Sequence, residues 1–163
     1  MLRKNSILFF SISLLFFLQV FVSAAYGQAK KTIDVKLYFS NPKLPAYETD
    51  CAAGTFVTRA ISPTKKTADA ALKLLFAGPT DDEKAKGMEG LSSLGDFYIG
   101  VTIKNRKAIV NFRTGAEKYL YVSGPLCMQE SVLTPIEKTL KQFSSVKGVD
   151  YAIDGKIIEE WDA

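Results

Sequence analysis

The chain has 163 residues, 47% of them hydrophobic, and a formal net charge of +4, so it fits one folded domain plus a short appendage. Two of the positive charges, Arg3 and Lys4, precede a long apolar run. The rest of the chain has 19 basic and 17 acidic residues, an excess too small to indicate nucleic-acid binding. The chain has no histidine, which excludes Ser-His-Asp and Cys-His nucleophile systems and His-ligated zinc.

Residues 1–29 have the layout of a secretory signal peptide. Arg3 and Lys4 form a basic start, residues 7–22 are almost uninterruptedly apolar and uncharged, and small residues follow. This pattern predicts export, cleavage between residues 25 and 29, and a mature domain over residues 30–163. The alternative is an uncleaved N-terminal anchor, because a run of this length nearly spans a thin bilayer.

The two cysteines of the chain are Cys51 and Cys127. An even number of cysteines in an exported protein predicts a disulfide bridge between them. The bridge would close a loop of 77 residues, from 51 to 127. Loop-closure entropy then gives it roughly 4 kcal/mol of stabilisation. The alternative is two separate buried thiols. A redox-active pair is not expected, since the chain has no C-x-x-C spacing.

The mature chain opens with two extended segments. Residues 34–39 alternate between apolar and polar side chains and predict a strand. Residues 40–54 contain two prolines and end in glycine, so we expect a loop there. Residues 55–61 are rich in β-branched side chains and predict a short extended segment or edge strand.

A helix is predicted next, over residues 67–77. Its apolar residues recur at helical spacing, and we expect Thr67 to be the N-cap. Gly78 suits the position after the last helical residue, and Pro79 prevents the helix from continuing.

The acidic stretch that follows, FAGPTDDEKAKG at residues 76–87, has two interpretations. Three successive acids could ligate a metal or act in catalysis, but neighbouring helical residues diverge by about 100° and do not converge on one point. As a helix start, Thr80 is the N-cap and Glu83 its capping-box partner, while Asp81 and Asp82 lie where the helix dipole favours negative charge. We therefore predict a cap rather than an active site.

Residues 88–96 are rich in glycine and serine and predict a loop, which leads into a hairpin. Its strands are expected at residues 97–103 and 107–112, joined by a turn at residues 104–106 in which Asn105 takes a positive φ. Alternation in the first strand places four apolar side chains on one face: Phe97, Ile99, Val101 and Ile103.

A second main helix is predicted over residues 128–143. Pro135 interrupts it, so it is either kinked there or restarts with Thr134 as N-cap and Glu137 as capping partner. A last strand is expected at residues 149–153. The tail after it, which carries Trp161, extends the sheet or packs across it.

These elements give the order β-(β)-α-β-β-α-β in one domain. The expected fold is α/β (α+β): a single two-layer domain of split βαβ type, with two helices over one face of a mixed sheet.

Surface side chains offer two candidate contact sites. Tyr119 and Tyr121 are either a stacking platform for sugar or peptide or a pair with one ring packed inward and one outward. Lys104 and Arg106 form, with Lys107, a basic hairpin tip that either contacts an anionic polymer or is simply solvated.

Four stretches in order resemble the GerMN domain of sporulation and germination proteins. They are FVTRAI, which contains Arg59, then ALKLLFAGPTDDEKAKG, VTIKNRKAIVNF and IEKTLKQFSSVKGVDYAIDG. The resemblance runs from about Val35 to Gly155 and also extends to the two cysteines, which supports the bridge. It departs at Arg106, where glycine is usual. The resemblance implies an extracytoplasmic domain organised like the ring-building motifs of envelope machines.

The resemblance supplies no catalytic residue, and we expect neither enzymatic activity nor a cofactor or metal. The favoured hypothesis is an exported module that assembles a cell-envelope complex by contact with envelope proteins or further copies of itself. The first alternative is binding of a small molecule, a peptide or a cell-wall glycan, and the last is a carboxylate-based envelope hydrolase. The candidate interaction residues are Arg59, Lys104, Arg106, Tyr119 and Tyr121.

Overall fold

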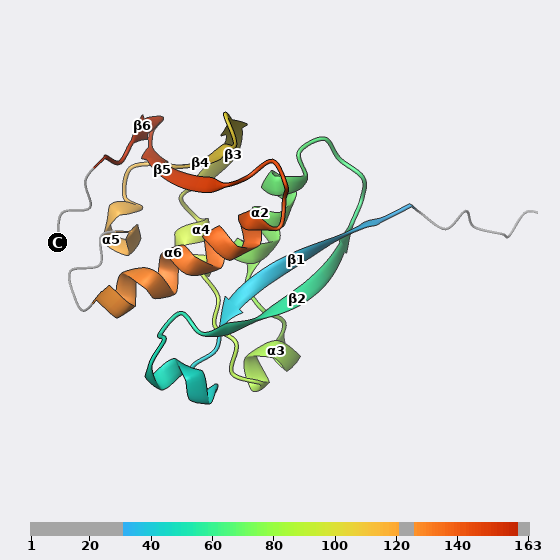
Figure 1. Ribbon diagram of the computed structural model, residues 1–163, viewed down its shortest axis with the longest axis vertical. Helices are drawn as coiled ribbons and strands as arrows, with labels where there is room; N and C mark the ends of the chain where they lie inside the picture. Colours follow the sequence, from blue (N-terminus) through green and yellow to red (C-terminus); the bar gives the residue numbers. More distant parts are fainter. Residues whose placement is uncertain (1–30, 121–125, 160–163) are drawn as a thin grey trace, which may run out of the picture. The chain divides into compact units, whose positions relative to one another are not determined.

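The computed structural model describes residues 31–120 and 126–159, except for the side chains of residues 126–128. The chain divides into two units, residues 1–31 and 32–163, and the described residues belong almost entirely to the second. The predicted signal peptide, Tyr121 and Trp161 lie outside the described residues. The elements of the second unit are β1 (Ile33–Ser40), η1 (Pro45–Glu48), β2 (Gly54–Ile61), α2 (Thr67–Ala77), α3 (Asp81–Ala85), α4 (Ser92–Gly95), β3 (Tyr98–Lys104), β4 (Lys107–Phe112), α5 (Glu117–Leu120), α6 (Leu126–Lys141), β5 (Gly148–Ile153) and β6 (Lys156–Ile157) (Figure 1).

The strands form two sheets. β1 and β2 pair antiparallel, from Ile33 opposite Ile61 to Ser40 opposite Gly54. The other sheet has the order β3-β4-β5-β6, in which β4 and β5 are parallel and the other neighbours antiparallel. The α+β class and a mixed sheet are therefore confirmed, although the strands are divided between two sheets where one was expected. The short β6 shows that the tail extends the sheet.

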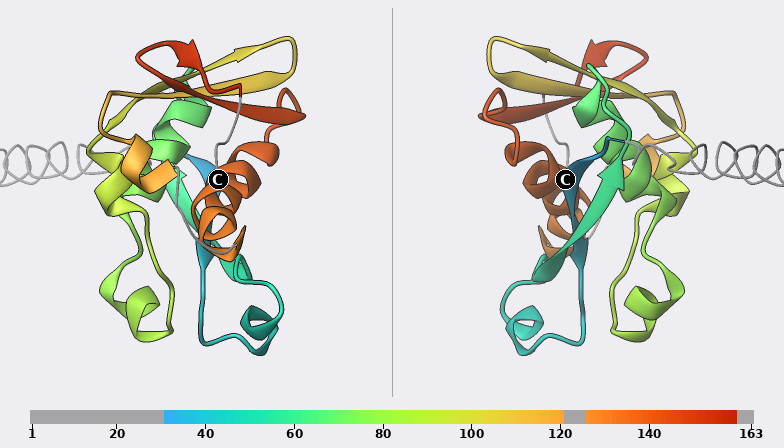
Figure 2. Two further views of the ribbon diagram at one scale, coloured as in Figure 1. Left: turned by 90° about the vertical axis from the view of Figure 1, so that its left-hand side faces the viewer. Right: turned by 90° about the vertical axis from the view of Figure 1, so that its right-hand side faces the viewer.

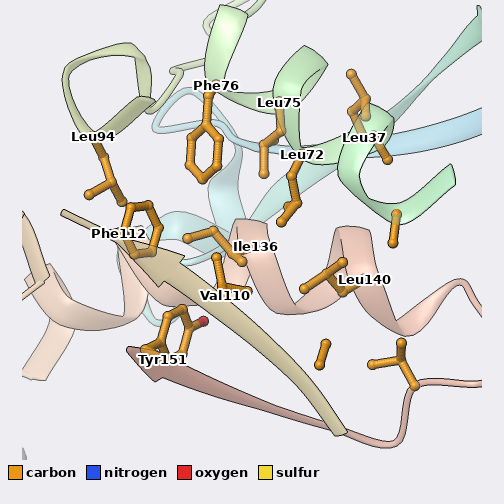
Figure 3. Packing of buried hydrophobic residues seen from close by; sticks show 14 of the residues in the cluster. Leu37, Leu72, Leu75, Phe76, Leu94, Val110, Phe112, Ile136, Leu140 and Tyr151 are labelled. Carbon is orange, nitrogen blue, oxygen red and sulfur yellow. The ribbon is translucent and has the colours of Figure 1, made fainter. Parts of the chain in front are cut away.

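The core lies between the four-stranded sheet and the helices α2 and α6, which cover one of its faces (Figure 2). Figure 3 shows Leu72, Leu75 and Phe76 of α2 pointing toward Val110 and Phe112 of β4. Ile136 and Leu140 of α6 fill the same interior, and β1 packs against both helices through Val35, Leu37 and Phe39. The alternation in residues 34–39 and 107–112 thus placed the inward side chains of both strands correctly.

Side chains of α6 and of Gln142, the residue that follows it, close the outer edge of β1. Gln142 accepts a hydrogen bond from the Lys36 amide at 2.8 Å and donates one to its carbonyl at 2.7 Å. The fully buried Thr139 hydroxyl accepts from the Tyr38 amide at 3.0 Å. Farther along, the Glu89 amide donates to the Ser40 carbonyl at 2.9 Å. These bonds occupy the edge of β1 that faces away from β2, in the place of a further strand.

The helices begin and end close to their predicted bounds, with one correction at α2. Lys66, not Thr67, is the N-cap, because the Thr67 hydroxyl donates to the Thr64 carbonyl at 2.9 Å and Thr67 is already helical. Gly78 ends α2 with φ 87°, as expected. The short helices α4 and α5 were not predicted; residues 88–96 were expected to be loop throughout.

Helix α6 is continuous through Pro135, so a restart at Thr134 is not observed. Ile136 and Leu140 are fully buried just beyond the proline, and their packing stabilises the helix on that side. The helix also begins earlier than expected, at Leu126, and ends at Lys141, before Phe143.

The β3–β4 hairpin has a two-residue turn. Asn105 has the predicted positive φ, 51°, but Arg106 also lies in the left-handed region, at 63°. Asparagine tolerates this conformation, whereas a long side chain is disfavoured there. The turn therefore holds strain at the residue where the GerMN pattern usually has glycine.

We expect Arg106→Gly to raise the free energy of unfolding by about 0.5–1 kcal/mol, because glycine adopts positive φ without steric cost. Urea unfolding measures the change. Asn105→Gly is the matched control and should have a smaller effect. An Arg106→Gly protein less stable than the wild type would contradict the assignment of strain to Arg106.

Candidate functional site

The acidic stretch forms the predicted helix cap. The Thr80 hydroxyl accepts from the Glu83 amide at 3.4 Å, and the Glu83 carboxylate accepts from the Thr80 amide at 2.9 Å, which completes a capping box. Asp81 is almost fully exposed and pairs with Lys84. Among the described residues, no group of three His, Cys, Asp or Glu side chains could hold a metal ion.

Arg59, a candidate interaction residue, is bound within the domain. Its guanidinium donates to the Glu83 carboxylate at 2.5 Å and so joins β2 to the start of α3. The hydrogen bond from Arg59 lowers the pKa of Glu83, and bonds from Thr80 reinforce this against the opposing effect of burial. The resulting stabilisation is present at neutral pH and lost as the pH falls through the lowered pKa.

Tyr119 lies on α5 and packs against Phe97, with ring centroids 5.8 Å apart. The ammonium group of Lys118 is 4.9 Å from the Tyr119 ring centroid. Its hypothetical partner in a stacking platform, Tyr121, lies outside the described residues. The described contacts of Tyr119 are thus those of an inward-packed ring.

The predicted basic tip is formed by the β3–β4 turn. Lys104 and Arg106 are exposed, while Lys107 pairs with Asp150 at 2.9 Å. The tip continues directly from β3. Lys104 and Arg106, which have no ion pair among the described residues, therefore lie at the end of that strand.

A groove of about 690 Å³ lies beside β3, and we call it the β3 groove. Its lining combines lysines and apolar side chains, among them Lys65, Lys66, Lys73, Ile99, Ile103 and Phe143. β3 is the outermost strand of the four-stranded sheet, so the backbone groups on its outer edge pair with no other described strand. The groove therefore borders an open sheet edge.

Ile99 and Ile103 are the exposed apolar side chains of β3, with 50% and 39% of their surface accessible. The sequence pattern placed both with Val101 on one face, and the register confirms this for Ile103, since Val101 and Ile103 stand opposite the buried Val110 and Ala108. The register of β3 against β4 shifts between Tyr98 and Gly100, however, and Tyr98 packs inward against Phe76. A glycine inside a strand is a signal for such a bulge, and Gly100 provided it.

Charge in the β3 groove is predominantly positive. Asp69 is its one acid, and it accepts hydrogen bonds from Tyr98 at 2.9 Å and pairs with Lys73 at 2.9 Å. Burial alone would raise the pKa of Asp69, but the bonds from Lys73 and Tyr98 outweigh it and the pKa is lowered. Burial and Asp69 raise the pKa of Tyr98. Asp69 is thus ionised, which leaves Lys65 and Lys66 as excess positive charge.

A second, shallower pocket of about 470 Å³ lies over the β1–β2 sheet, beside Phe56. Two of its lysines already have partners: Lys138 lies 4.3 Å from the Tyr38 ring centroid, and Lys141 pairs with Glu137 at 2.6 Å. Among the described residues, Lys36 has neither an ion pair nor a ring contact. The β3 groove is the stronger candidate because it joins an open edge to apolar surface and excess charge.

Within residues 31–120 and 126–159, no helix is both long and apolar enough to cross a membrane.

Comparison with curated proteins finds no match. Solved structures share the fold, among them two of one protein. One is the tandem GerMN domains of the sporulation protein GerM from Bacillus subtilis (TM-score 0.58, 22% identity), covering 82% of this chain and 43% of that one. The other is the first GerMN domain of the same protein (TM-score 0.53, 21% identity), covering 81% of this chain and 90% of that one.

This chain therefore spans less than half of the tandem-domain protein and matches one of its domains in size. The model of the Germane family, described as sporulation and spore germination, matches residues 36–159. Because that match takes in nearly all of the described domain, the chain belongs to the Germane (GerMN) family of sporulation and spore germination domains.

Proposed function

We propose that this protein is a non-enzymatic, exported interaction module of the bacterial cell envelope, which binds an extended acidic segment of a partner protein along β3. The observation that carries the proposal is the open edge of β3, with Ile99 and Ile103 exposed beside the lysines of the β3 groove. The signal-like residues 1–29 and the family support the location.

Strand addition matches the shape of this site. An open edge presents unpaired amide and carbonyl groups, which give an added strand its affinity, while neighbouring pockets select its side chains. Ile99 and Ile103 would receive apolar side chains of the segment. Burying each exposed isoleucine is worth about 1 kcal/mol, since roughly half of its surface is already covered.

The charges indicate an acidic partner. Lys65 and Lys66 lie on one side of the β3 groove, and Lys104 and Arg106 lie at the end of the strand. A segment with carboxylates flanking two apolar residues complements this arrangement. Such exposed charges mainly speed association and select the partner, so binding should weaken with salt.

The alternatives have less support. The hypothesis of sugar or small-molecule binding depended on a hollow lined by Tyr119, Tyr121 or Trp161. Tyr119 packs against Phe97, and the β3 groove is lined by other residues. The hydrolase hypothesis depended on two carboxylates facing across a cleft, whereas Asp69 is the one acid lining the β3 groove and Glu83 is bound to Arg59.

Photo-crosslinking from position 103 in producing cells tests the proposal. We expect crosslinks to an acidic segment of an envelope protein, and a synthetic peptide of that segment should bind the purified protein. The double variant Ile99→Ser/Ile103→Ser should weaken peptide binding at least about tenfold, because it removes two apolar contacts of about 1 kcal/mol each without changing the charge of the groove.

Ile157→Ser is the matched control, since Ile157 is equally exposed, at 48%, but lies on β6 at the other edge of the sheet. It should leave binding unchanged. Two results would overturn the proposal: equal loss of binding in both variants, or retention of the protein on purified cell-wall glycan with no protein crosslinked at position 103.

A further inference from the structure

The geometry points to a second interaction surface, the outer edge of β2, whose occupant is β2 of another copy of this chain. Two copies would pair antiparallel about a two-fold axis and form a four-stranded sheet. The inference is independent of the β3 groove, because β2 belongs to the other sheet.

The bonds of β1 identify which backbone groups of β2 face outward. Lys36, Tyr38 and Ser40 use their amides or carbonyls on the side facing away from β2. In an antiparallel pair, directly opposite residues point their backbone groups the same way, either toward each other or both outward. The residues opposite these three are Thr58, Phe56 and Gly54, so their amides and carbonyls lie on the open edge. The backbone groups of successive residues alternate between the two edges of a strand, so those of Ala60 also lie on the open edge. The Thr58 carbonyl accepts a long bond, 3.4 Å, from the guanidinium of the adjacent Arg59, which an added strand would replace.

The side chains of this edge do not protect it. Natural edge strands are usually shortened, bulged or interrupted by lysine or proline, which prevents pairing with another chain. β2 has eight residues in regular register and contains neither lysine nor proline. Its one charged residue, Arg59, is held by Glu83. Phe56 is 47% exposed, and Thr58 and Ala60 are exposed on the same face.

The sequence of β2 is self-complementary in one register. If the two-fold axis passes between the two copies of Thr58, each Phe56 faces an Ala60 and each Val57 faces an Arg59. Large side chains then oppose small ones, no like charges meet, and the outward backbone groups of Thr58 form a hydrogen-bonded pair. A shift of one residue in the axis, to Arg59, would place the two guanidinium groups opposite each other, which is unfavourable.

The inference depends on the exposed strand alone, so the expected affinity is modest. A pair of single strands buries less than a standard protein interface, and we expect a dissociation constant on the order of tens of micromolar. Tethering of copies at an envelope surface would raise their effective concentration above this value.

Sedimentation equilibrium of the protein recovered from producing cells tests the inference, from about 1 to about 300 µM, a range that brackets the expected dissociation constant. Thr58→Lys and Thr58→Glu should each weaken dimerisation at least about tenfold, because each places like charges opposite each other. An equimolar mixture of the two variants should restore dimers, since the opposite charges then face each other at the axis.

Thr102→Lys is the matched control, because Thr102 is an exposed threonine on the other open edge strand, β3. It should dimerise as the wild type does. A wild type that stays monomeric up to the highest concentration would overturn the inference, as would equal weakening by Thr102→Lys. A mixture of the Thr58 variants that remains monomeric would overturn the register.

Discussion

Replacing Phe112 with alanine is expected to lower the free energy of unfolding by about 3–5 kcal/mol. Phe112 is fully buried at the end of β4, where its ring centroid lies 5.8 Å from that of Phe76 and 6.0 Å from that of Tyr98. The truncation removes both ring contacts and leaves a cavity where β4 meets α2. Urea unfolding followed by circular dichroism measures the loss.

Phe56→Ala makes the same chemical change at a half-exposed position and is the matched control. It loses one edge-to-face contact with Tyr38, at 5.0 Å, and should cost less than about 1.5 kcal/mol. Similar losses in the two variants would show that Phe112 does not anchor the core as its burial indicates.

Removing the proposed Cys51–Cys127 bridge should cost roughly 4 kcal/mol, because a loop of 77 residues regains its freedom in the unfolded chain. Several contacts bring the two positions toward one another. Cys51 precedes Ala53, whose carbonyl accepts from the Asn41 amide at 2.8 Å. The neighbouring Ser40 hydroxyl donates to the carbonyl of Ser131, one turn along α6 from Cys127. The side chain of Cys127 lies outside the described residues, so the bridge stays a prediction.

Intact mass with and without reduction detects the bridge, and unfolding of Cys51→Ser/Cys127→Ser measures its contribution. Under reducing conditions the wild type and the double variant should be equally stable, which separates the covalent link from any effect of the serines. Two thiols that react with an alkylating agent in the exported protein would contradict the prediction.

The sequence predicted the elements whose pattern is set locally. The alternation of β1 and β4, the apolar stripe of α2 and the Thr80–Glu83 capping box all follow from side chains within a few positions of each other. Helices α4 and α5 were missed because each has only four residues, too few to show a helical period. The continuity of α6 through Pro135 could not be predicted, because it is stabilised by packing of Ile136 and Leu140 against residues distant in the sequence.

The site was less predictable because its geometry depends on distant partners. Arg59 was singled out by resemblance, but its ion pair with Glu83 joins residues 24 positions apart. Lys104 and Arg106 were expected at a hairpin tip and are there. Val101 and Ile103 stand opposite the buried Val110 and Ala108, so both keep the face that alternation predicted, although Ile103 is 39% exposed there. The irregularity between Tyr98 and Gly100 instead turns Tyr98 toward Phe76 and leaves Ile99 50% exposed. Neither open edge can be recognised without knowing how the strands are ordered.

The closure of β1 by α6 also affects how the chain is made. Lys36 and its partner Gln142 are 106 positions apart, so the hairpin of β1 and β2 is synthesised long before the side chains that cover its edge. During that interval both edges of the hairpin are open to other chains, and contacts at this separation form slowly. A nascent chain that stalls before residue 142 therefore lacks this partner and exposes both strand edges of the β1–β2 hairpin.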